Sequence, residues 1–104
     1  MKKYGFNGEV YDEKELLEAA ENILENEGES FFKEEFDELN EKVEIAGYTY
    51  LASRVLEEVD PIAYKCEFAN WTSDKLEYFE YKLSCLSEGN STELLDYTIY
   101  CEED

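Results

Sequence analysis

Histidine is absent from this chain of 104 residues, and basic residues, proline and cysteine are scarce. Without histidine the chain lacks the commonest general base and the commonest metal ligand, and a serine or cysteine nucleophile would have no imidazole to activate it. Neither a glycine-rich phosphate loop nor a calcium loop of alternating acids occurs. We therefore expect a protein that is not an enzyme and that uses no cofactor or metal.

The three cysteines, Cys66, Cys85 and Cys101, are spaced too widely for a zinc site or a redox pair. An odd number of thiols without a signal peptide is typical of a reducing compartment. We expect free cysteines that are buried as small hydrophobic side chains, in a cytoplasmic protein. No apolar run approaches the roughly 20 residues that cross a bilayer, so no membrane contact is expected.

Acidic residues dominate the charge of this chain. The chain has 28 acidic residues against 9 basic ones, a net charge of −19. Such a surface repels nucleic acid and anionic lipid, and it attracts cationic protein surfaces. Apolar residues make up 43% and aromatic residues 15% of the chain, which argues against disorder. The length fits a single domain over residues 1–104.

The N-terminal segment predicts a short strand or a tight hairpin, followed by a helix. Aromatic and β-branched residues flank the turn pair Asn7-Gly8, which is typical of such a segment over residues 2–11. Asp12 stands at a helix N-cap position with Glu15 three residues later, which is a capping box. The helix should end at Gly28.

A second helix is predicted from Ser30 to just before Gly47, because apolar residues recur at steps of four, three and four. That apolar stripe comprises Phe32, Phe36, Leu39 and Val43. The acidic residues Glu34, Asp37, Glu38 and Glu41 should lie on the opposite side of the same helix. A third helix is predicted over residues 49–59.

The pair Asp60-Pro61 should end the third helix and begin a short fourth one over residues 61–71, with Ile62 and Cys66 inward. Residues 76–86 alternate in a way that favours a strand, antiparallel to a second strand over residues 94–102. A helix over residues 74–86 is the competing interpretation. The predicted fold class is α+β, with N-terminal acidic helices packed on a small antiparallel sheet that includes a C-terminal hairpin.

The acidic residues concentrate between Glu9 and Glu44, where 15 acids and three lysines give a net charge of −12. Carboxylates one helical turn apart are separated by ~5.4 Å, and phosphates along one DNA strand are a little farther apart. Two packed acidic helices would therefore resemble the charge pattern of a nucleic-acid backbone. The candidate phosphate surrogates are Glu18, Glu21, Glu25, Glu34, Asp37, Glu38 and Glu41. Tyr48 and Tyr50, beside Gly47, are the candidate aromatic contacts at the centre of an interface.

In size, charge, absence of histidine and content of tyrosine and phenylalanine, the chain resembles the DNA-mimic inhibitors of phages and mobile elements. These include anti-restriction proteins, uracil-DNA glycosylase inhibitors and anti-CRISPR proteins. The segment YLASRVLEEVDPIAYKCEFANW, from Tyr50 to Trp71, is similar to a segment of small phage-type proteins that contains D-P-x-A-Y. That local similarity implies a mobile-element origin.

The resemblance implies an inhibitor that acts in the cytoplasm of a bacterial host cell. Its expected partner is a basic nucleic-acid-binding protein, such as a Cas effector or a restriction enzyme, and the chain itself would bind no nucleic acid. The alternative is an adaptor or antitoxin-like module that binds a partner through an apolar or aromatic groove. The sequence also leaves open whether the chain forms a homodimer through a sheet edge.

Overall fold

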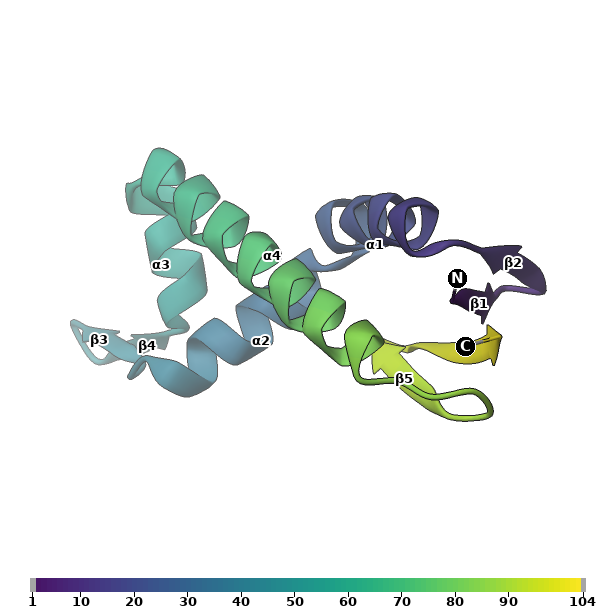
Figure 1. The fold of residues 1–104 in the computed structure, drawn as a ribbon. Helices are drawn as coiled ribbons and strands as arrows, with labels where there is room; N and C mark the ends of the chain where they lie inside the picture. Colours follow the sequence, from purple (N-terminus) through teal and green to yellow (C-terminus); the bar gives the residue numbers. More distant parts are fainter. Residues whose placement is uncertain (1, 104) are drawn as a thin grey trace.

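A computed structural model describes residues 2–103 as an elongated molecule of 58 × 22 × 21 Å. Its radius of gyration is 17.0 Å, compared with about 13 Å for a compact chain of this length. The long helix α4 (Pro61–Ser84) runs diagonally through the molecule and joins its two ends (Figure 1). We call the end that contains the larger sheet the sheet lobe and the opposite end the distal lobe.

The sheet lobe contains four antiparallel strands in the order β2-β1-β6-β5. They are β1 (Lys3–Phe6), β2 (Glu9–Tyr11), β5 (Ser91–Leu94) and β6 (Tyr97–Glu103). The N-terminal hairpin turns at Asn7 and Gly8, both with positive φ, as the sequence predicts. The C-terminal hairpin β5–β6 pairs with β1, which confirms the α+β fold class.

The main core lies where this sheet meets α1 (Glu13–Glu27) and the C-terminal half of α4. Leu16, Ala20 and Leu24 form the buried stripe of α1, and the capping box of Asp12 and Glu15 is present as predicted. The residues that complete the core include Tyr4, Phe6, Phe79, Leu83, Leu94, Ile99 and Cys101.

The distal lobe is organised around a second, aromatic cluster. Helix α2 (Glu29–Leu39) follows α1 directly. Gly28 at the junction is buried against the Trp71 ring, and a Cβ at this position would come within 2.8 Å of that ring. The Phe32 ring packs against four other aromatic rings, with centroids 5.3 to 5.9 Å away. These neighbours are Phe36 of α2 and Tyr64, Phe68 and Trp71 of α4.

The prediction that the second helix continues to residue 46 was wrong. Helix α2 ends at Leu39, and a separate hairpin follows, formed by β3 (Val43–Ile45) and β4 (Tyr48–Tyr50). Helix α3 (Ala52–Val59) begins three residues later than predicted. Period-two alternation around Ala46-Gly47 was the overlooked signal, because it predicts a hairpin where the helical period has ended.

The predicted strand over residues 76–86 was also wrong, and the competing helix is confirmed. Helix α4 runs unbroken over 24 residues, so the predicted end of the fourth helix at Trp71 was wrong as well. Phe79 and Leu83, four residues apart, reach the core, while Tyr78 and Tyr81 are exposed. The alternation of Phe79, Tyr81 and Leu83 therefore reflected aromatic content rather than a strand.

Two expectations about buried side chains also fail. Cys101 is buried as expected, but Cys66 and Cys85 are exposed. In the first turns of α4, Tyr64 is buried while Ile62 is exposed. No helix of the described residues has the length and apolar character needed to cross a membrane.

Removing the Phe32 ring should destabilise the protein far more than removing an equally apolar side chain from the surface of the same helix. We expect Phe32→Ala to lower the free energy of unfolding by about 3–5 kcal/mol, because it empties the centre of the aromatic cluster. Leu39→Ala should change it by less than about 0.5 kcal/mol, because Leu39 is 78% exposed. Urea unfolding followed by circular dichroism measures both, and equal losses would refute the role of this cluster.

Candidate partner-binding surfaces

Several acidic side chains of α1 and α2 hold the fold together through neutral donors. The Tyr97 hydroxyl donates to Glu27 Oε1 at 2.7 Å, and the Tyr64 hydroxyl donates to Glu29 Oε2 at 2.7 Å. Burial, together with the Glu29 carboxylate, raises the pKa of Tyr64 well above its ordinary value. These bonds tie the acidic helices to the sheet and to α4 without neutralising any carboxylate.

Glu35 is tied in the same way, with one added cation. The Trp71 indole N–H donates to Glu35 Oε2 at 3.0 Å, and Lys75 Nζ lies 3.1 Å from the same oxygen. The hydrogen bond from Trp71 and the nearby lysine lower the pKa of the Glu35 carboxyl below its ordinary value, against the opposing effect of desolvation.

Asp37, one of the predicted phosphate surrogates, has an internal role. Its carboxylate accepts from the Ser53 backbone N–H at 2.8 Å and from the Ser53 hydroxyl at 2.9 Å. Ser53 lies in the first turn of α3, whose own N-cap residue, Leu51, provides no side-chain bond. Asp37 therefore caps α3 from a neighbouring helix, at the end where the helix dipole favours negative charge.

The other predicted acidic residues are exposed, and none has a hydrogen bond or ion pair within the described residues. They are Glu18, Glu21, Glu25, Glu34, Glu38 and Glu41. Glu41 lies in the loop after α2 rather than on the helix, because α2 ends at Leu39.

These carboxylates are not gathered on one face. Glu21 and Glu25 line a groove between α1 and α4, whereas Glu34 and Glu38 line a separate groove between α2 and α4. The two grooves share no lining residue. The negative charge of the two helices therefore follows different sides of α4.

The acidic charge is largely uncompensated inside the molecule. Ion pairs between described side chains join Lys33 to Glu57, Arg54 to Glu58 and Lys75 to Glu35, at 3.1 to 3.5 Å. The last turns of α1 and α2 contain no basic residue, although the helix dipole favours cations there. The fold retains its negative charge even where pairing or cations would stabilise it.

The groove between α2 and α4 combines negative charge with aromatic rings. It encloses about 410 Å³, and Phe31, Trp71 and Tyr78 contribute rings to its lining. Lys75 Nζ lies 5.8 Å from the centroid of the Trp71 ring, and Lys82 Nζ lies 4.8 Å from that of Tyr78. Two lysines of the chain therefore already lie over these ring faces. The lining keeps a negative balance, because it contains the carboxylates of Glu34, Glu35, Glu38 and Glu93.

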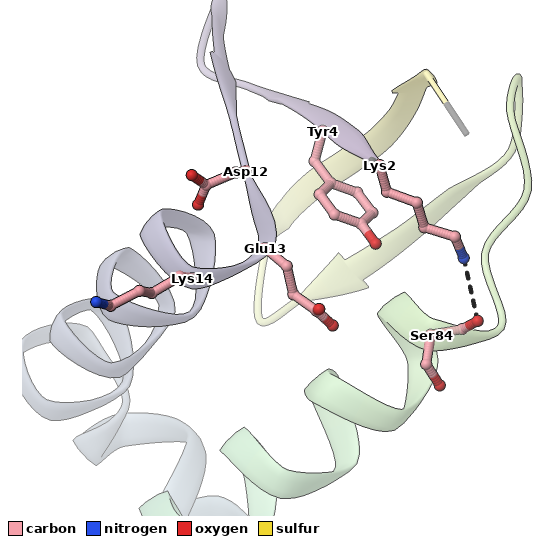
Figure 2. A pocket seen from close by; sticks show the side chains of 6 residues that line it. All are labelled: Lys2, Tyr4, Asp12, Glu13, Lys14 and Ser84. Atoms are coloured by element: carbon pink, nitrogen blue, oxygen red, sulfur yellow. Dashed lines mark hydrogen bonds between the residues drawn. The ribbon is translucent and has the colours of Figure 1, made fainter.

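A different cavity, of about 460 Å³, lies where the N-terminus of α1 approaches the C-terminus of α4 (Figure 2). Lys2 Nζ donates to the backbone carbonyls of Ser84 at 3.1 Å and Leu86 at 2.8 Å, at the negative end of α4. Asp12 caps α1 through the Glu15 backbone N–H at 2.8 Å. Helix capping therefore accounts for these two charged groups, and the described residues contain no cluster with the ligands for a metal ion.

Tyr48 and Tyr50, the predicted aromatic contacts, are exposed on β4 in the distal lobe. They share the hairpin with Ile45, which the sequence interpretation did not single out. The sequence contained a signal for it, because the alternation of Val43 and Ile45 just before the turn is typical of a strand.

Comparison of the chain with models of protein families, with curated proteins and with solved structures gave no significant match. A functional interpretation therefore depends on the surfaces described above.

Asp37 and Glu34 lie on the same helix, but only Asp37 is hydrogen-bonded within the fold, so their substitutions should differ in their effect on stability. We expect Asp37→Ala to lower the free energy of unfolding by about 1–3 kcal/mol, because it leaves the Ser53 hydroxyl, in a residue only 2% exposed, without its acceptor. Glu34→Ala should leave stability unchanged or raise it slightly, since it removes an unpaired negative charge. Chemical denaturation of both variants measures the difference, and equal stability would contradict the capping role of Asp37.

The lowered pKa of Glu35 predicts a specific dependence of stability on pH. Since the ordinary pKa of 4.5 applies to the unfolded chain, the stabilisation by Glu35 is present above about pH 4.5 and is lost as the pH falls through the lower folded value. We expect Glu35→Gln to destabilise the protein at about pH 7, and the difference from wild type to shrink towards about pH 3. Glu34→Gln is the matched control, and a constant difference for Glu35→Gln across this range would contradict the assignment.

Proposed function

We propose that this protein inhibits a DNA-binding host-defence protein or nuclease, of the Cas effector or restriction enzyme class, by occupying its cationic DNA-binding groove as a nucleic-acid mimic. The observation that carries the proposal is the set of exposed carboxylates without internal partners on α1, on α2 and in the following loop. In a chain of net charge −19, these groups are free to contact lysine and arginine side chains of a partner.

The geometry of the acids supports this proposal. Glu21 and Glu25, like Glu34 and Glu38, are separated by four residues, which is a rise of about 6 Å along a helix. The molecule is a rod with a cross-section of 22 × 21 Å, and its length of 58 Å exceeds one ~34 Å turn of duplex DNA. Because the acids lie on different sides of α4, a groove that encloses the rod would contact more of them than a flat surface.

The cost of the charge also supports a role in binding. Acids three and four residues apart on one helix repel one another by a few tenths of a kcal/mol per pair. A cationic groove would remove this repulsion on binding, and the charge would also speed encounter with the partner.

A second candidate function is a protein-interaction module, adaptor or antitoxin-like, that binds through apolar contacts. The large exposed side chains of the distal lobe favour it, since Leu39, Ile45 and Tyr48 are among them. The two functions differ in what they require of the acids, because a purely apolar contact would not depend on them.

The proposal predicts inhibition that depends strongly on salt and on the acids of the distal lobe. The wild-type protein should displace target DNA from a purified, guide-RNA-loaded Cas effector or from a purified restriction enzyme. The affinity should fall steeply between about 50 and 500 mM NaCl. Glu34→Lys/Glu38→Lys/Glu41→Lys should weaken binding at least about tenfold and leave the fold intact, because a lysine in the last turn of α2 favours the helix dipole.

The matched control reverses three exposed acids of equal total charge elsewhere, Glu77→Lys/Glu80→Lys/Glu88→Lys. Equal weakening by both triple variants would indicate a net-charge effect and contradict binding through the α2 acids. Affinity that is unaffected by salt and by both variants would favour the apolar interaction module. Failure of the wild-type protein to displace DNA from any of these enzymes would contradict the proposed function.

A further inference from the structure

The β3–β4 hairpin has one apolar face made of four side chains. Its register pairs Val43 with Tyr50 and Ile45 with Tyr48. Directly paired residues of antiparallel strands project to the same side of a sheet, so these four side chains share one face. Glu44 and Thr49, which pair with each other, occupy the opposite face. The hairpin is amphipathic, like a strand pair that lies on a core.

Three of the four side chains on this face are exposed, and Val43 is half-buried. Ile45 is 57% exposed, Tyr48 is 68% exposed and Tyr50 is 41% exposed. Leu51, which follows directly after β4, is also exposed. The hairpin forms a two-stranded sheet of its own at the tip of the distal lobe (Figure 1). A two-stranded hairpin is marginal in water unless its apolar face packs on something, so this face lacks the contact that its pattern requires.

The turn of the hairpin carries strain. Ala46 has φ of 53° and Gly47 has φ of 83°, and positive values at both central residues define a type I′ turn, which prefers Asn-Gly. An alanine in the left-handed region costs roughly 1–2 kcal/mol. The hairpin is therefore formed despite an unfavourable turn residue and an uncovered apolar face.

The surrounding charge indicates what covers the apolar face. Glu38, Glu41 and Glu44 are exposed without internal partners in the described chain, and Lys42 is the basic residue among them. A second copy of the chain would bring a further net charge of −19 to the contact, and an anionic membrane would be repelled in the same way. A positively charged protein surface is therefore favoured as the occupant of this face.

We infer that the β3–β4 hairpin is the apolar anchor of the interface, and that it inserts into an apolar recess bordered by lysine or arginine side chains on a basic protein partner. This inference rests on the proposed function and identifies the part of the interface that acts at short range. Tyrosines in desolvated central pockets supply much of the energy of protein interfaces. The unpaired acids set the rate of encounter, and the hairpin sets the lifetime of the complex.

The test measures association and dissociation rates against immobilised, purified guide-RNA-loaded Cas effectors and restriction enzymes. Tyr48→Ala should speed dissociation at least about tenfold, with the association rate and its salt dependence unchanged. Ala46→Asn should slow dissociation, because a favoured turn residue preorganises the hairpin. The matched control is Tyr100→Ala, which removes a tyrosine that is 52% exposed on β6 in the sheet lobe.

The outcomes distinguish failure of the hairpin inference alone from failure of the proposed function. If the wild-type protein binds and the Glu34/Glu38/Glu41 reversal weakens binding, but both hairpin variants dissociate like wild type, the hairpin inference alone fails. If the wild-type protein binds none of the enzymes, both proposals fail. If light scattering finds a dimer that Tyr48→Ala dissociates, a second copy covers the hairpin, and the inference of a basic partner is overturned. If Tyr48→Ala impairs folding, the dissociation rate of Ala46→Asn tests the inference instead. Dissociation slower than that of the wild-type protein supports the inference, and an unchanged rate contradicts it.

Discussion

The contacts of α1 and α2 with helix α4 determine the rest of the structure. At the junction of α1 and α2, Gly28 lies against Trp71, and the absence of a Cβ lets the two helices meet α4 there. Phe32 then packs among the rings of the first half of α4, while Leu24 belongs to the core that the second half shares with the sheet. One long helix thus supports two cores that follow one another along its length, with Trp71 packed against both, and the molecule is a rod 58 Å long.

The fold holds its acidic helices in place largely with neutral hydrogen-bond donors. Tyrosine hydroxyls bind Glu27 and Glu29, an indole N–H binds Glu35, and a serine binds Asp37. A neutral donor satisfies a carboxylate without removing its charge, whereas a salt bridge would cancel it. The scarcity of basic residues and the abundance of tyrosine are therefore two parts of one arrangement, which stabilises the fold and leaves its net charge negative.

The proposed inhibitor would divide long-range and short-range recognition between different parts of its surface. The exposed acids of α1 and α2 would act over about a Debye length, near 8–10 Å at physiological salt, and would favour basic partners. The hairpin that contains Ile45 and Tyr48 would act only on contact, through the burial of apolar area. In the proposed inhibitor, attraction alone would hold many basic proteins weakly, and the apolar anchor would give the complex its specificity and its lifetime.

Local signals in the sequence determined much of the architecture. The capping box at Asp12, the turn at Asn7-Gly8 and the helix end at Gly28 each depend on neighbouring residues alone, and all were predictable. The negative charge and the absence of histidine likewise follow from composition.

Only the tertiary structure decided which acids are internal and where the long helix ends. Asp37 and Glu34 are both acids of the same predicted helix face, but Ser53 of α3 donates two hydrogen bonds to Asp37, whereas Glu34 has no hydrogen bond among the described residues. The segment around Phe79 had both helical and strand periodicity, and in the structure it belongs to α4, which places Phe79 and Leu83 in the core beneath the sheet. These outcomes depend on contacts between residues that are far apart in the chain. Patterns among neighbouring residues therefore could not predict them.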